Sequence, residues 1–283
     1  MASFTNFATL SYNGGTTNSN IVTGEILEAL TAVKTAVSAN YSAGDRITYA
    51  LSLVNTGTAA ITDYTVTDNL GGYTVGANTV YPLAYNAGTV RYYINGVLQA
   101  APTVTAGPPL TVTGLTVPAG GSAVLIYETT ATPVAPLATG SSITNTATIT
   151  GGGLTTPITA QATVETANSA DLTISKALSP TTVTENGRIT YTFVISNTGN
   201  TEATATGNVV VTDTFAPILR NIAVTYNGTA WTEGTNYTYN AATGVFTTLA
   251  GQITVPAASF TQNTDGTFTV TPGTATLVIT GTV

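Results

Sequence analysis

Two segments of this chain are nearly identical and lie far apart in the sequence. One reads RITYALSLVNTG from Arg46, and the other reads RITYTFVISNTG from Arg188, 142 residues later. Further matches keep the same order: YTVTDNL with VVVTDTF, YYINGVL with VTYNGTA, and VPAGGSAVLIYETTAT with VTPGTATLVITGTV. The repeat predicts two tandem domains that share one fold.

Each copy alternates apolar and polar residues with a period of two, which is typical of strands with one buried face. About seven such short segments occur in each copy, separated by turn signals such as Asn-Gly. The chain is 43% hydrophobic and only 7% charged, which argues against disorder. The helix-like stretch GEILEALTAVKTAV is short, and its second half matches ADLTISKALS, which has the pattern of a strand. We therefore predict an all-β chain with two tandem immunoglobulin-like β-sandwich domains.

The two copies end differently. After AVLIYETTAT the first copy continues into ITNTATITGGGLTTPITAQATVET, which predicts a closing β-hairpin, whereas the second copy reaches ATLVITGTV without one. A similar segment, SFTNFATLSYNGGTTNS, stands at the start of the chain, where Asn6 and Ala8 align with Asn145 and Ala147. The expected order is an N-terminal donor hairpin (1–28), a complete domain (29–168) and an incomplete domain (169–283).

The displaced hairpin predicts how the chain associates. An incomplete sandwich exposes unpaired strand edges and an uncovered apolar face, and a lone hairpin is marginally stable in water. Both problems are solved if the hairpin of one subunit completes the second domain of the next by strand addition. Such a contact does not close, so the expected partner is the chain itself, in a head-to-tail filament. The alternative is that these residues are a fragment of a longer array of repeats.

Several segments also resemble a known family. DLTISKALSP, GRITYTFVISNTGN, VVVTDTF and ITNTATIT are similar to the conserved repeat domain of bacterial surface proteins known as domain of unknown function eleven. The resemblance covers most of both domains, and it implies an extracellular or cell-surface module that is structural or adhesive and is not an enzyme. The opening residues MASFTNF lack a basic region followed by an apolar stretch, so we expect no secretion signal there.

Polar residues interrupt the apolar face of equivalent strands in both copies. The chain has two lysines, at matching places in the two repeats, and strand parity puts each on the inward face. An aspartate and an asparagine on other strands share this placement. The residues are Lys34, Asp68 and Asn145 in the first domain, Lys176 and Asp213 in the second, and Asn6 in the hairpin.

A buried Lys, Asn and Asp can form an isopeptide bond, and pilin and adhesin domains of Gram-positive bacteria are similar in this respect. Burial favours a neutral amine, which attacks the Asn carbonyl while Asp68 or Asp213 shuttles protons and ammonia leaves. Lys34 and Asn145 would bond within one chain, whereas Lys176 would bond Asn6 of the neighbouring subunit. The alternative without chemistry is a buried Lys–Asp ion pair that is hydrogen-bonded to Asn.

Composition excludes several functions. The chain has no Cys and no His, so we expect no disulfide, no zinc site, no cofactor and no enzyme acting on an external substrate. Six basic residues and a net charge of −7 argue against a nucleic-acid partner. No apolar run approaches the roughly 18 residues of a membrane helix. The alternative to a filament subunit is an adhesin or surface-stalk fragment that binds a protein or a glycan.

Overall fold

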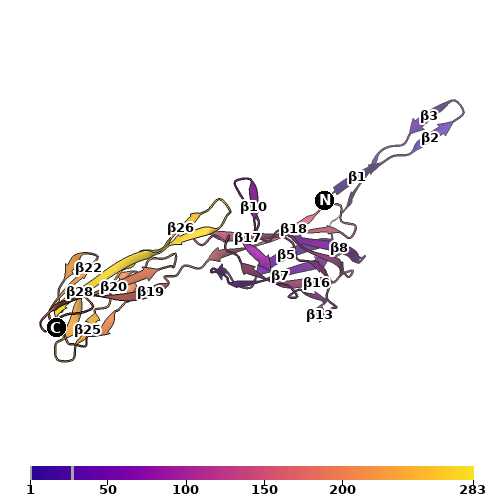
Figure 1. The fold of residues 1–283 in the computed structure, drawn as a ribbon. Coiled ribbons are helices and arrows are strands. Elements are labelled where there is room, and N and C mark those ends of the chain that lie inside the picture. Colours follow the sequence, from indigo (N-terminus) through magenta and orange to yellow (C-terminus); the bar gives the residue numbers. More distant parts are fainter. Residues whose placement is uncertain (1, 27–28) are drawn as a thin grey trace. The chain divides into compact units, whose positions relative to one another are not determined.

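The computed structural model describes residues 2–26 and 29–283, and it confirms the all-β, immunoglobulin-like class. Apart from the short 3-10 helix η1 (Ala205–Gly207), the described residues form strands, turns and loops (Figure 1). The chain divides into two compact units. Unit 1 extends to Ala135 and includes Ser142–Glu165, and unit 2 comprises Pro136–Ser141 and Thr166–Val283. The domain limits expected from the sequence, at 28/29 and 168/169, remain predictions.

The first strands form a two-stranded arm, as the sequence predicts. The ladder is not continuous, because β1 pairs with β4 and β2 pairs with β3 in separate sheets. At the break Ser19 replaces a regular ladder step, since the backbone N–H of Ala8 donates to Ser19 Oγ at 2.9 Å. The strands of this arm are β1 (Ala2–Asn6), β2 (Thr9–Tyr12), β3 (Gly15–Asn18) and β4 (Val22–Ile26).

Unit 1 is a sandwich of two antiparallel sheets. One sheet has the order β13-β12-β16-β7-β5, with β11 also paired to β16, and the other has the order β14-β15-β8-β17-β18-β6. A small hairpin, β9 (Tyr73–Val75) and β10 (Asn78–Val80), stands beside them. The first sheet contains β5 (Leu30–Ala36), β7 (Arg46–Asn55), β11 (Leu83–Tyr85), β12 (Arg91–Ile94), β13 (Val97–Leu98) and β16 (Ser122–Ala131). The second contains β6 (Asn40–Tyr41), β8 (Ile61–Asp68), β14 (Thr103–Thr105), β15 (Leu110–Val117), β17 (Ser142–Gly151) and β18 (Ile158–Thr166).

Unit 2 repeats the first of these sheets and part of the second. The larger sheet has the order β19-β20-β28-β22-β23, and the smaller has the order β21-β25-β24. The hairpin of β26 and β27 lies between two segments that are joined directly by a short turn in unit 1. The strands are β19 (Leu172–Ser179), β20 (Arg188–Asn197), β21 (Thr212–Thr214), β22 (Arg220–Tyr226), β23 (Thr229–Trp231), β24 (Tyr237–Asn240), β25 (Val245–Thr248), β26 (Ser259–Gln262), β27 (Phe268–Thr271) and β28 (Gly273–Thr282).

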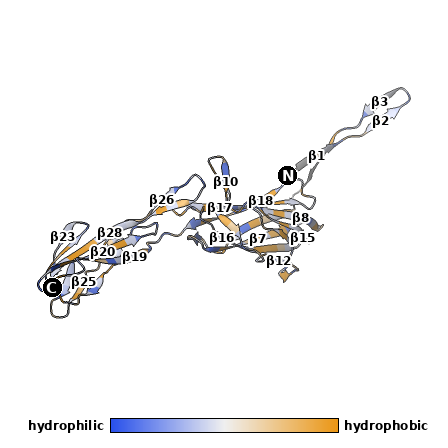
Figure 2. Ribbon diagram, viewed as in Figure 1, coloured by the Kyte–Doolittle hydropathy of each residue, from blue (hydrophilic) through white to orange (hydrophobic). Residues whose placement is uncertain are grey.

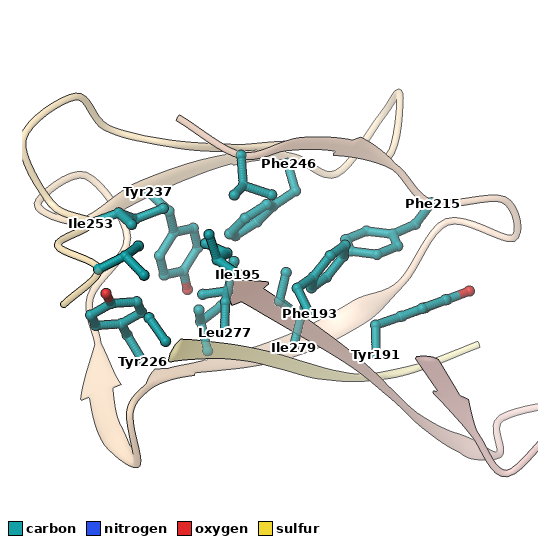
Figure 3. Packing of buried hydrophobic residues seen from close by; sticks show 14 of the residues in the cluster. Tyr191, Phe193, Ile195, Phe215, Tyr226, Tyr237, Phe246, Ile253, Leu277 and Ile279 are labelled. Atoms are coloured by element: carbon teal, nitrogen blue, oxygen red, sulfur yellow. The ribbon is translucent and has the colours of Figure 1, made fainter. Parts of the chain in front are cut away.

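The cores follow the alternation in the sequence. Figure 2 shows apolar and polar residues alternating along the sandwich strands. In β7 every second side chain is buried, from Ile47 to Leu53, and β16 and β20 behave in the same way. The core of unit 2 is rich in aromatic rings: Phe215 lies 4.9 Å from Tyr191 and 6.3 Å from Phe246, measured between ring centroids (Figure 3).

The repeated Asn-Thr-Gly after the matching strands has a structural role in each unit. Asn55 and Asn197 are buried, and each side chain forms hydrogen bonds with the backbone of the loop that follows it. Asn197 Nδ2 donates to the carbonyls of Thr201 (2.8 Å) and Pro256 (3.0 Å), while its Oδ1 accepts from the backbone N–H of Gly199 (2.9 Å). The turn motif is therefore a buried hydrogen-bonding site as well as a chain reversal.

Candidate functional site

A buried ion pair joins the two sheets of unit 1. Lys34 extends from the edge strand β5 and Asp68 ends β8 in the opposite sheet, and Lys34 Nζ lies 2.5 Å from Asp68 Oδ2. The exposed fractions of the two side chains are 0% and 1%. The structure thus brings together two of the three residues that strand parity predicts to face the core of this domain.

Tyrosines complete the surroundings of this pair. The hydroxyl of Tyr127 donates to Asp68 Oδ2, and the backbone N–H of Leu70 donates to Asp68 Oδ1 at 2.9 Å. Lys34 Nζ also lies 4.8 Å from the ring centroid of Tyr49 and 5.8 Å from that of Tyr127. The carboxylate is therefore fully engaged, while the amine has one carboxylate and two aromatic faces as neighbours.

Burial dominates the acid–base properties of the site. Desolvation lowers the pKa of Lys34 to about 8, although Asp68 opposes the shift through its charge and its hydrogen bond. Desolvation also raises the pKa values of Tyr49 and Tyr127, and the negative charge of Asp68 adds to this effect. The neutral form of Lys34 is therefore populated at a lower pH than that of a lysine in water.

Asn145 is the third predicted residue, and its amide is unsatisfied. It lies on β17 two residues from Ala147, which pairs directly with Asp68, so it faces the same core. The side chain is fully buried, and neither Nδ2 nor Oδ1 makes a hydrogen bond of normal geometry with any residue that the structure describes. The nearby amide partly opposes the rise in the pKa values of Tyr49 and Tyr127, but it makes no hydrogen bond of normal geometry with either hydroxyl. Each unpaired buried group costs about 1–3 kcal/mol.

The two tyrosines were not among the candidates from the sequence. A signal exists, because period two places Tyr49 and Tyr127 on the inward faces of their strands, where a phenolic hydroxyl needs a polar partner. Their cross-strand pairing, which brings the two rings to 5.8 Å, depends on the register of β7 and β16.

Unit 2 holds a similar ion pair in a more open setting. Lys176 Nζ lies 2.5 Å from Asp213 Oδ2, but 41% of the lysine side chain and 18% of the aspartate side chain are exposed. The lysine lies over three rings, at 4.5 Å from Tyr191, 5.4 Å from Phe193 and 5.6 Å from Phe215. These rings occupy one end of the cluster in Figure 3. The inward direction expected for Lys176 is present, without the cover that would bury it.

The cover is missing because one edge of the smaller sheet is open. In unit 1, β8 pairs with β15 on one side and with β17 on the other. In unit 2 the corresponding strand β21 pairs with β25, and no described strand pairs with its other edge. Within the described residues, unit 2 therefore has no counterpart of the β17–β18 hairpin and no asparagine at the place of Asn145.

The facing strand shows the same deficiency. The inner face of β5 is covered, with Leu30 and Lys34 buried, whereas the matching residues of β19 are partly or largely exposed. Ile174 is 55% exposed even though its parity directs it toward the core. Unit 2 thus presents an apolar surface, the acceptor groove, which is formed by β21 and the inner residues of β19: Leu172, Ile174, Lys176 and Leu178.

The arm offers a matching surface. The cross-strand pairs Phe4–Gly24 and Asn6–Val22 lie on one face of the β1–β4 ladder, and Leu10 and Tyr12 share a face of the β2–β3 ladder. Phe4 is 53% exposed and Leu10 is 63% exposed. Asn6 is exposed as well, and the structure does not bring it to a lysine.

The described part of the chain has no cluster of three or more acidic residues that could hold a metal ion. No helix within the same residues is long and apolar enough to cross a membrane.

The fold and the site define an immunoglobulin-like chain with one complete sandwich, one open sandwich and an exposed arm. No family model and no curated protein matches it. Among solved structures, the major pilin subunit BcpA of Bacillus cereus is 14% identical over 96% of this chain and 73% of its own, with TM-scores of 0.38 and 0.36 in two structures. The pilus backbone protein RrgB of Streptococcus pneumoniae is 12% identical over 86% of this chain and 55% of its own, with a TM-score of 0.34. An adhesin N-terminal domain of Streptococcus gordonii is 14% identical over 48% of this chain, with a TM-score of 0.36, and the match spans 32% of that domain.

Proposed function

We propose that this chain is a structural subunit of an extracellular filament, in which the arm of one copy completes unit 2 of the next. The observation that carries the proposal is the open edge of β21, at the place where unit 1 has the β17–β18 hairpin. An unpaired edge beside an uncovered apolar face favours the addition of a strand.

The sequence of the arm identifies it as the occupant. Along β17 the inward residues are Ile143, Asn145, Ala147 and Ile149, and all of them are buried. The aligned residues of the arm are Phe4, Asn6, Ala8 and Leu10, and all of them are exposed. The arm therefore carries the residue pattern that closes unit 1, while it leaves this pattern uncovered on its own.

Docking would bury the apolar face of the arm. Phe4, Leu10, Tyr12 and Val22 are each more than half exposed, and burying the exposed part of each contributes roughly 1–2 kcal/mol. Ladder hydrogen bonds along β21 add to this, against an association cost of about 4 kcal/mol or more. Non-covalent docking of the arm is thus favourable but reversible.

An isopeptide bond would make the assembly permanent. In unit 1 a proton passes from the Lys34 ammonium to Asp68, and the neutral amine attacks Cγ of Asn145. A new Nζ–Cγ bond forms and the Cγ–Nδ2 bond breaks. Lys34 loses two protons in total: one converts the departing NH2 group into ammonia, and the other remains on Asp68. Support comes from the buried pair and from the unsatisfied amide beside it. The same step in unit 2 would join Lys176, with Asp213, to Asn6 of the neighbouring subunit.

Substitutions on the two faces of the arm test the assembly. Leu10→Asp places a charge on the docking face, and Ser11→Asp places the same charge on the opposite face, with both positions exposed in the free subunit. We expect filaments from the wild type and from Ser11→Asp in negative-stain microscopy, and dispersed subunits or amorphous aggregate from Leu10→Asp. Normal filaments from Leu10→Asp would show that the arm does not dock through this face.

A further inference from the structure

The two ion pairs of this chain form a comparison within one molecule. Both Lys–Asp contacts measure 2.5 Å, yet the lysine side chain is 0% exposed in unit 1 and 41% exposed in unit 2. The distance between the charged groups is therefore the same in the two places, whereas the exposure of the lysine differs.

Cover changes the chemistry available to the amine. In unit 1 desolvation outweighs the attraction of Asp68 and lowers the pKa of Lys34 to about 8. In unit 2 the lysine side chain is 41% exposed, beside a carboxylate and over three aromatic faces, so it lacks the burial that surrounds Lys34. An ammonium ion has no lone pair and cannot attack an amide.

In unit 1 both strands of the β17–β18 hairpin carry buried inward residues. Lys34 lies on β5, the edge strand of its sheet, and in the opposite sheet β17 and β18 follow β8 outward toward the same edge. The first strand contributes Asn145 and Ala147, which are fully buried. The second contributes inward residues that are buried as well: Ala160, Ala162 and Val164.

We propose that the acceptor groove of unit 2 selects a complete two-stranded hairpin as its bonding partner, because β1 delivers Asn6 while β4 excludes the water that keeps Lys176 unreactive. This inference rests on the proposed function. In the arm Val22 lies directly opposite Asn6, as Ala162 lies opposite Asn145 in unit 1. A single extended strand that carries an asparagine would then dock without bonding, and the free subunit would keep an inert lysine until an arm covers it.

Full-length variants allow a single bonding event to be measured. A donor chain with Lys176→Met keeps a reactive arm but has no lysine to bond in its own acceptor groove. An acceptor chain with Asn6→Ala keeps Lys176 in its acceptor groove, but its own arm cannot bond. Their mixture yields one covalent dimer on a denaturing gel. The rate at saturating acceptor reports the chemical step, and the acceptor concentration at half-saturation reports docking.

Donor variants in the second strand test the inference. Val22→Asp faces the groove, Thr23→Asp puts the same charge on the other face, and Val22→Ala thins the cover without adding charge. We expect Thr23→Asp to match the parent donor, and both Val22 variants to lower the saturating rate, with Val22→Asp the slower of the two because a nearby carboxylate favours the ammonium form of an amine. If Val22→Ala and Val22→Asp change only the half-saturation, β4 serves docking alone and the inference is wrong.

Amine labelling separates this failure from failure of the proposed function. In filaments of the Asn6→Ala chain, which cannot bond, Lys176 should resist an amine-reactive ester, and adding Val22→Ala should restore its labelling. With only two lysines in the chain, peptide mass identifies the modified one. If filaments form but Lys176 is labelled equally with and without Val22→Ala, then β4 does not exclude water from Lys176, although the proposed assembly is still supported. If the donor and acceptor chains do not associate at all, the proposed function is wrong.

Discussion

Replacing the buried charges of unit 1 by neutral groups of similar size distinguishes an isopeptide bond from an ion pair by the sign of the effect. The variant is Lys34→Met with Asp68→Asn, made in a Lys176→Met background so that subunits cannot be joined. An asparagine at position 68 can accept from the backbone N–H of Leu70 through its oxygen and donate to the Tyr127 hydroxyl through its nitrogen, and neither substitution leaves an unpaired charge. If Lys34 and Asp68 form only an ion pair, this exchange should be neutral or stabilising by about 1–4 kcal/mol.

A covalent bond predicts a large loss instead. Lys34 and Asn145 are 111 residues apart, and closing a loop of that length removes roughly 5 kcal/mol of conformational entropy from the unfolded chain, in the relation developed for disulfides. For a unit of this size the loss corresponds to a fall in Tm of roughly 15 °C.

Calorimetry and intact mass together measure the outcome. We expect the Lys176→Met chain to be lighter than its sequence mass by about 17 Da, the mass of one ammonia, and the triple variant to have its full sequence mass and a lower melting transition for unit 1. A Lys176→Met chain of unaltered mass, with a unit 1 that melts no higher than the variant, would refute the inference from the unsatisfied Asn145.

Three other predictions follow from the geometry. Tyr127→Phe removes a hydroxyl that binds Asp68 and should slow the mass loss of unit 1 after refolding, which time-resolved mass measurement would detect; an unchanged rate would leave Tyr127 a packing role only. In a chain with Asn145→Ala and Lys176→Met, in which neither unit can bond, the free energy of unfolding should rise between about pH 8 and pH 9.5. The unfolded chain keeps the Lys34 proton up to its ordinary pKa, whereas the folded state loses it near 8, and urea unfolding at several pH values would show a flat profile if burial did not lower this pKa. Asn197→Ala removes at least three hydrogen bonds of a buried side chain and should cost roughly 3 kcal/mol in unit 2; equal melting of Asn197→Ala and wild type would contradict the role of the turn motif.

The fold was predictable because its signals are local and occur twice. Period-two alternation and turn residues identify the strands, and the repeat shows which strands are equivalent in the two units. Parity also places Lys34, Asp68 and Asn145 on inward faces, which requires no knowledge of the neighbouring strands. The direction of a side chain is thus encoded within its own strand.

The burial of a side chain by neighbouring strands is not encoded within its own strand. Lys176 has the same parity as Lys34, yet its exposure depends on strands that pair with β21, far from it in the sequence. The tyrosine surroundings of Asp68 likewise depend on the register between β7 and β16, and at the place of Tyr127 the second unit has Ile279. The break in the arm at Ser19 also escapes a period-two pattern, because a side chain there substitutes for a backbone partner.

Asn6 carries the strongest argument for a partner. Its neighbours along the docking face, Phe4 and Leu10, are apolar and exposed, and an apolar residue at position 6 would continue that face without a break. The free subunit gains nothing from an amide there, since Asn6 is exposed and closes no core. In unit 1 the aligned Asn145 lies on β17 two residues from Ala147, which pairs with Asp68, and the described part of unit 2 has the matching Lys–Asp pair without an asparagine. Under the proposed function, docking would bring the amide of Asn6 to the Lys–Asp pair in unit 2 of another copy of this chain.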